Sequence, residues 1–125
     1  MPVTTSNAPE AIGSYSQAIR AGNTIYLSGQ IPLIPETMEI VSKDFREQLH
    51  QVIKNLQTVA DAAGGSFNDI VKLTVYLTDL KNFPLVNEIM PEYFTIPYPA
   101  RVAIGVSQLP KEALVEIDAV LYLGD

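Results

Sequence analysis

Two charged side chains, Arg101 and Glu116, are the residues of this sequence best suited to chemistry. Arg101 opens the run 102–106, where apolar residues alternate with small ones, a pattern typical of a strand. Because a guanidinium keeps its charge in proteins, an Arg at the start of a partly buried strand requires an anionic partner. That partner is either a carboxylate of the protein, such as Glu116, or the carboxylate of a ligand.

Weaker candidates lie in loops and at strand ends. Ser28 and Gly29 end a strand-like run, where a glycine lets the backbone approach a ligand closely or simply marks a bulge. Tyr15 lies in the Gly- and Ser-rich segment 13–17, where an aromatic ring either packs against the protein or covers a site. His50 falls on the polar side of a predicted helix, so we interpret it as a solvated surface residue.

Composition excludes several classes of function. A chain of 125 residues fits one domain, and its net charge of -6 with scattered basic residues argues against nucleic acid as the main ligand. The absence of cysteine and the single histidine argue against a disulfide, a thiol nucleophile and a Cys/His metal site. No signal peptide and no membrane-length apolar run is visible. We therefore expect a cytoplasmic single domain over residues 1–125, with no metal, nucleic acid or membrane partner.

Hydrophobic periodicity predicts an α+β domain with the element order β-β-α-β-α-β-β. Apolar residues at helical spacing predict a first helix over 42–63, with Ser42 as its cap and Gly64 just after its end. A second helix is predicted over 82–94, and Pro91 should kink or break it. The predicted strands cover residues 18–22, 24–30, 70–80, 101–107 and 113–123.

Alternation along the strands assigns their residues to two faces of the sheet. One face is fully apolar and must lie under the helices; it carries Ile25, Leu27, Val71, Leu73, Val75, Leu77, Val102, Ile104, Val115, Ile117, Ala119 and Leu121. The other face is mixed and carries Tyr26, Ser28, Lys72, Thr74, Tyr76, Arg101, Ala103, Gly105, Glu116 and Asp118. Since two helices cover one face only, we expect other copies of the chain to cover the mixed face; a half-exposed antiparallel sheet is the alternative. Arg101 and Glu116 would then share this face, and an internal salt bridge between them is the competing interpretation.

The chain resembles the RidA (YjgF) family over nearly its whole length. The similarity rests on the tracts Tyr15-Ser16-Gln17-Ala18, Ser28-Gly29-Gln30-Ile31-Pro32, Pro99-Ala100-Arg101 and Glu116-Ile117, with further matches between them. The resemblance implies a chorismate-mutase-like mixed sheet with two helices on one face. It also implies a homotrimer around a central β-barrel, with ligand clefts between subunits.

The resemblance also implies an activity, the deamination of 2-imino acids. Such enzymes hydrolyse the enamine and imine products that pyridoxal-phosphate-dependent serine and threonine dehydratases release, and they yield 2-oxo acids and ammonia without a metal or cofactor. Arg101 would bind the substrate carboxylate with its planar fork, and Glu116 would activate water or shuttle protons. The other positions that the resemblance places around the substrate are Tyr15, Ser28, Gly29, Asn87 and Ala103.

Four residues depart from the family pattern: Ser14, Pro91, Ala103 and Asp118 replace the proline, helix former, cysteine and glutamate that are common there. Two other functions are considered beside the deaminase. A non-catalytic trimeric protein that binds or senses 2-oxo acids would use the same Arg101. An RNA-cleaving or translation-inhibiting activity has also been attached to the family, but the acidic charge and the lack of a His pair make it the weakest reading.

Overall fold

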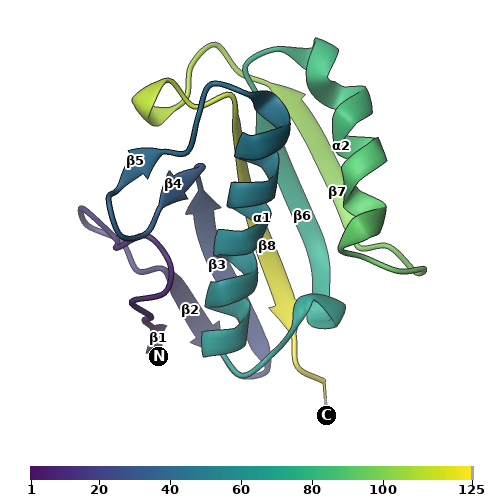
Figure 1. Cartoon of the computed structure of the whole chain (residues 1–125). Coiled ribbons are helices and arrows are strands. Elements are labelled where there is room, and N and C mark those ends of the chain that lie inside the picture. Colours follow the sequence, from purple (N-terminus) through teal and green to yellow (C-terminus); the bar gives the residue numbers. More distant parts are fainter. Residues whose placement is uncertain (125) are drawn as a thin grey trace.

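Six strands form one mixed sheet, and both α-helices pack on the same side of it (Figure 1). The structure is a computed structural model and describes residues 1–124. The sheet has the order β1-β2-β3-β8-β6-β7, and all neighbours are antiparallel except the parallel pair β6–β7. Its strands are β1 (Pro2–Val3), β2 (Ala18–Ala21), β3 (Thr24–Gln30), β6 (Ile70–Leu77), β7 (Ala100–Gly105) and β8 (Val115–Tyr122). A separate small hairpin pairs β4 (Leu33–Ile34) with β5 (Glu39–Ile40).

The order of the five predicted strands and two predicted helices is confirmed, whereas β1, β4 and β5 are too short to produce a sequence pattern. The strand predicted to run to residue 80 ends at Leu77. Asp79 interrupts it, because its side chain accepts a hydrogen bond from the Lys81 backbone N–H at 2.9 Å and caps the 3₁₀ helix Leu80–Asn82.

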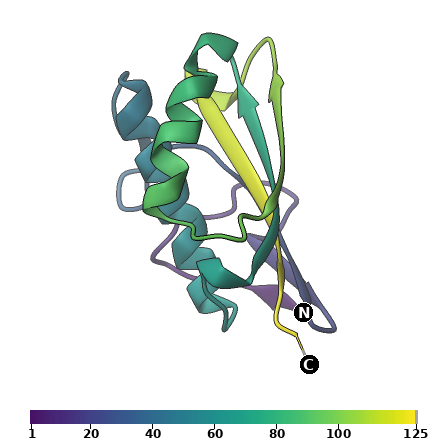
Figure 2. The ribbon, with the colours of Figure 1, turned by 90° about the vertical axis from the view of Figure 1, so that its right-hand side faces the viewer.

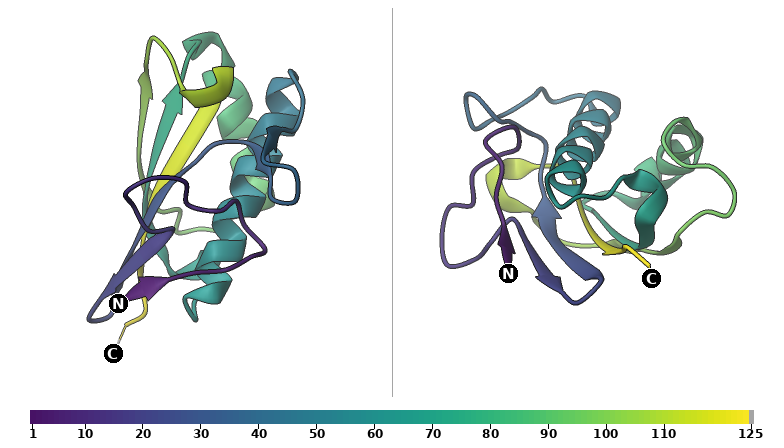
Figure 3. Two further views of the ribbon diagram at one scale, coloured as in Figure 1. Left: turned by 90° about the vertical axis from the view of Figure 1, so that its left-hand side faces the viewer. Right: turned by 90° about the horizontal axis from the view of Figure 1, so that it is seen from below.

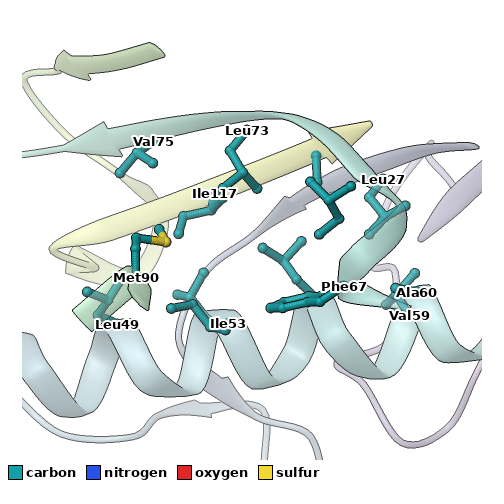
Figure 4. Packing of buried hydrophobic residues seen from close by; sticks show 14 of the residues in the cluster. Leu27, Leu49, Ile53, Val59, Ala60, Phe67, Leu73, Val75, Met90 and Ile117 are labelled. Carbon is teal, nitrogen blue, oxygen red and sulfur yellow. The ribbon is translucent and has the colours of Figure 1, made fainter. Parts of the chain in front are cut away.

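Helix α1 (Phe45–Ala62) supplies most of the helical contribution to the core. Its eight predicted core positions are all buried: Phe45, Leu49, Val52, Ile53, Leu56, Val59, Ala60 and Ala63. The helix packs on β8 and β3, and Figure 4 shows Leu49 and Ile53 turned toward the sheet. The cap is Asp44 rather than Ser42, because the Asp44 carboxylate accepts a hydrogen bond from the Glu47 backbone N–H at 3.0 Å. Gly64, with φ of 88°, follows the helix as predicted.

Helix α2 (Phe83–Ile89) is half as long as its apolar pattern suggests, and the predicted interruption by Pro91 is confirmed. The chain continues as a 3₁₀ helix over Met90–Glu92. Proline has no backbone N–H, so it cannot donate the helical hydrogen bond to the Asn87 carbonyl four residues earlier. The early end of α2 leaves room beside β6 and β7 for the cavity described below.

The face assignment of β7 was wrong. Arg101 pairs with Leu73, and Ala103 pairs with Val75. Leu73 and Val75 are buried under the helices, and residues opposite each other in paired strands share a face, so Arg101, Ala103 and Gly105 point to the helix side. Figures 2 and 3 show both helices on this one side of the sheet. The alternation of β7 was real, but its apolar residues face away from the core.

One residue of β6 was also misassigned. Val71 is 47% exposed, because the register of β6 against β8 shifts between residues 70 and 72. This irregularity puts Ile70 in the core in its place.

The face of the sheet opposite the helices is not covered by the chain itself. We call it the open face. Its most exposed apolar and aromatic side chains come from four strands: Ile19, Tyr26, Val102, Ile104 and Tyr122. Within residues 1–124, the structure has no helix with both the length and the apolar character needed to cross a membrane.

Candidate functional site

Arg101 lies at the start of β7, beside the helix α2. Its guanidinium carbon is 5.1 Å from the centroid of the Phe83 ring, so the cation stacks on the first residue of α2. Within the part of the chain that the structure describes, no carboxylate forms an ion pair with it. Arg101 is exposed in the single chain, so water solvates its charge there and the guanidinium is available to an anion from outside residues 1–124.

Next to this guanidinium is a cavity of about 400 Å³, which we call the α2 cavity. It is lined by Leu73, Asn87, Met90, Pro91, Phe94, Arg101 and the segment 98–99. Leu73, Met90 and Phe94 are buried core residues, so the inner wall is apolar. Asn87 and Arg101 bring the only amide and the only formal charge to the lining.

Glu116 occupies a different environment on the open face. Partial burial raises the pKa of its carboxyl above the ordinary value, and the negative charge of Asp118 adds to this shift. The Tyr76 hydroxyl donates a hydrogen bond to Asp118 Oδ2 at 2.8 Å, which holds the second carboxylate in place. A carboxyl with a raised pKa is suited to proton transfer near neutral pH.

Gly29 lies directly against Glu116. A Cβ atom added to Gly29 would overlap the carboxylate and would stand only 2.9 Å from Glu116 Cδ. The register of β3 against β8 shifts between Leu27 and Gln30, so the bulge considered at this position is confirmed. The glycine is therefore required for the close approach of the acid.

Arg101 and Glu116 are not neighbours within one chain, so the predicted shared face and the salt bridge are both wrong. Arg101 pairs with Leu73, and Glu116 pairs with Tyr76, which places the two residues two strands and three positions apart. At about 3.3 Å per residue and about 4.8 Å per strand, their backbones are separated by about 10 Å in each direction. Their side chains also leave opposite faces of the sheet, so one chain cannot hold a small substrate between them.

The other predicted site residues fall into two groups. Asn87 and Ala103 accompany Arg101 on the helix side, and we call these three the arginine group. The glutamate group consists of Ser28 and Gly29 on β3 and Glu116 on β8, together with Tyr15 from the loop that precedes β2. The loop that carries Tyr15 and Ser16 is held against β3, because the Ser28 hydroxyl donates a hydrogen bond to the Ser16 carbonyl at 2.6 Å. The neighbouring Tyr15 is half exposed and borders a hollow formed with Glu10, Glu36 and Met38, whose lining does not include Glu116.

Sequence reasoning missed Phe83 and Tyr76 as supports of the two groups. Their contacts join residues far apart in the chain, and no local pattern predicts them. His50 was wrongly assigned to solvent alone, because it is partly buried and its Nδ1 shares a hydrogen bond with the Tyr93 hydroxyl. No cluster of three or more His, Cys, Asp or Glu side chains placed to hold a metal ion occurs among residues 1–124.

The fold defines a class of small α+β domains, in which two helices cover one face of a mostly antiparallel sheet. A family model described as Endoribonuclease L-PSP matches residues 5–123. A RutC family protein of Pyrococcus horikoshii is 52% identical over 94% of each chain. A 2-iminobutanoate/2-iminopropanoate deaminase of Dermatophagoides farinae is 40% identical over 97% of this chain and 94% of its own.

The solved structures agree with the sequence relatives. The crystal structure of RidA from an Antarctic Psychrobacter superposes with a TM-score of 0.94 at 48% identity, over 98% of both chains. The chain therefore belongs to the RidA family, also called the YjgF or RutC family. The description of the family model refers to RNA cleavage, which the acidic charge of this chain disfavours.

Proposed function

We propose that this protein is a hydrolytic deaminase of 2-imino acids that works as a homotrimer. The observation that carries the proposal is Arg101, a guanidinium without a carboxylate partner in residues 1–124 that borders a small-molecule cavity. Its planar fork suits a substrate carboxylate. The deaminase name of the Dermatophagoides relative supports the reaction class.

The separation of the two groups supports an active site built from two subunits. The open face exposes apolar side chains at 41–54%, which is the kind of surface that a second copy covers in homo-oligomers. In the proposed trimer, the arginine group of one subunit meets the glutamate group of the next. The substrate then lies between groups that a single chain keeps about 10 Å apart in each sheet direction.

The reaction needs no redox step. Water adds to the protonated C=N carbon, the C–N bond of the resulting carbinolamine breaks, and a 2-oxo acid and ammonium leave. Glu116 accepts a proton from the attacking water and returns it to the nitrogen, so its charge is restored in each cycle. As the C–N bond breaks, the proton of the carbinolamine hydroxyl passes to the departing ammonia, which leaves as ammonium. Arg101 fixes the carboxylate, and backbone groups at Gly29 and Ala103 orient the rest of the substrate.

A coupled assay tests the activity. Threonine dehydratase generates the imine, and the formation of 2-oxobutanoate is followed with and without this protein. We expect acceleration by the wild type, a loss of at least a hundredfold with Arg101→Ala, and a similar loss with Glu116→Gln. No acceleration over buffer, or full acceleration by Arg101→Ala, refutes the deaminase.

Mixing the two variants tests the composite site. If Arg101 and Glu116 come from different subunits, co-expression of Arg101→Ala and Glu116→Gln chains rebuilds intact sites at about a quarter of the subunit interfaces. About a quarter of the wild-type activity should return. Mixed trimers that stay inactive would show that both residues act from one chain.

A non-catalytic binding protein is the second candidate, and the distance between Arg101 and Glu116 favours it. The arginine group alone can hold a carboxylate without a nearby general base. Calorimetric binding of 2-oxo acids, together with an inactive coupled assay, would establish this second function.

A further inference from the structure

The α2 cavity is larger than the smallest imino acids require. Its volume of about 400 Å³ falls within the range of about 300–1,000 Å³ that small-molecule sites occupy. The imines of serine and threonine dehydration carry only a methyl or ethyl group beyond the imine carbon. With the carboxylate on Arg101, such a group would leave most of this space to water.

The cavity walls favour an apolar occupant. Leu73, Met90 and Phe94 are 2–6% exposed and form the inner wall, while Pro91 adds a ring without a hydrogen-bond donor. In proteins, apolar walls with a few polar groups at one end orient a ligand that has an apolar body and one charged end.

The charge at the mouth fixes the orientation of that occupant. Arg101 brings the only formal charge to the lining, and Asn87 brings the only side-chain amide. A guanidinium attracts an anion, so the charged end of a ligand in this cavity would lie at Arg101. The ligand that fits is a carboxylate with an apolar tail.

We propose that the α2 cavity binds the substrate side chain, and that this protein prefers 2-imino acids with branched, thioether or aromatic side chains over those of three or four carbons. This inference rests on the proposed function, because it assumes that Arg101 holds the substrate carboxylate. The size and the apolar lining of the α2 cavity indicate which substrate side chains would fit. The source of such imines is an amino acid oxidase reaction, which transfers two electrons and two protons from leucine, methionine or phenylalanine to an acceptor such as O2 and leaves a C=N bond.

Product analogues measure the preference directly. The oxo acids 2-oxobutanoate, 4-methyl-2-oxopentanoate and 3-phenyl-2-oxopropanoate share the carboxylate and differ in the side chain. Each buried methylene strengthens binding about fourfold, so the two extra carbons of 4-methyl-2-oxopentanoate should lower Kd by about fifteenfold. Calorimetry on the wild-type protein gives the three values.

Filling the cavity should remove the preference. Pro91→Phe places a ring at an exposed position of the lining, and Met90→Phe narrows the cavity from its buried wall. Glu92→Phe adds the same ring at an exposed neighbour outside the lining and is the matched control. We expect the first two variants to weaken the binding of 4-methyl-2-oxopentanoate much more than that of 2-oxobutanoate, whereas Glu92→Phe leaves the ratio of the two Kd values unchanged.

The outcomes separate this inference from the proposed function. If no 2-oxo acid binds the wild type, or if Arg101→Ala binds them unchanged, the proposed function fails and this inference fails with it. If all three acids bind the wild type with equal Kd, or 2-oxobutanoate binds most tightly, the cavity does not hold the side chain and only this inference is overturned. The same ranking should appear in kcat/KM for imines made from leucine and 2-aminobutanoate by an amino acid oxidase.

Discussion

Replacing Gly29 with alanine should remove activity without unfolding the protein. The added Cβ would stand 2.9 Å from Glu116 Cδ and 3.2 Å from Cγ, so the carboxylate must retreat by about 0.5 Å to reach an ordinary contact of 3.4 Å. Its nearer oxygen must swing further. Displacements of this size in a catalytic group cost about 10- to 100-fold in rate, so we expect kcat to fall in that range.

The stability of the Gly29→Ala variant should change little. Gly29 does not adopt the left-handed backbone conformation, so alanine is allowed there. The lower entropy of the unfolded chain contributes about 0.4–1 kcal/mol of stability, which offsets part of the strain at Glu116. Thermal unfolding should therefore shift by no more than about 5 °C.

The assay compares kcat, KM and the pH profile of the variant with those of Gly105→Ala. A Cβ at Gly105 meets only the Leu80 side chain, at 3.2 Å from its Cγ, and that side chain is 55% exposed and can move aside. The control should keep wild-type activity. If Gly29→Ala keeps kcat within twofold and leaves the pH profile unchanged, Glu116 does not act on the reacting atoms.

Four further predictions follow from contacts in the structure. Because the pKa of Glu116 is raised, kcat/KM should fall as pH drops through a value above about 4.3, the ordinary glutamate pKa, and Asp118→Asn should move this limb to lower pH. Because the pKa of Glu116 is raised in the folded state, the protonated carboxyl stabilises the folded state at low pH, and this stabilisation is lost as pH rises through the folded pKa. Glu116→Gln should therefore not lower Tm at pH 7. Phe83→Leu should raise KM about 2- to 5-fold by removing the cation–π contact with Arg101, at constant kcat, and Phe83→Tyr should restore it. Asn55→Ala should cost about 1–3 kcal/mol in urea unfolding, because the buried Asn55 amide donates to the Leu33 carbonyl at 2.9 Å; a smaller loss would mean that water replaces it.

The sequence predicted α1 and the central strands well, because their patterns come from the core itself. The apolar positions of α1 and the alternation of β8 report burial on one side only. The early end of α2 followed from Pro91, whose missing N–H is a local property.

The composition of the site could not be predicted in the same way. Arg101 lies on an edge strand, where alternation shows two faces but not which of them meets the helices. That choice depends on the register of β7 against β6, a pairing of residues almost thirty positions apart. Because β7 was assigned the wrong way round, the sequence analysis placed Arg101 and Glu116 on the same face of the sheet, although the chemical reasons for choosing each residue still hold.

The position of β7 at the end of the sheet has a consequence for the protein in solution. Among residues 1–124, β7 pairs with β6 alone, so its other side presents backbone N–H and C=O groups that no strand pairs, beside the exposed Val102 and Ile104. A bare edge of this kind is a template for aggregation. A trimer that buries the open face beside this edge would expose both on dilution, so Tm should rise with protein concentration and dissociated chains should be the aggregation-prone species.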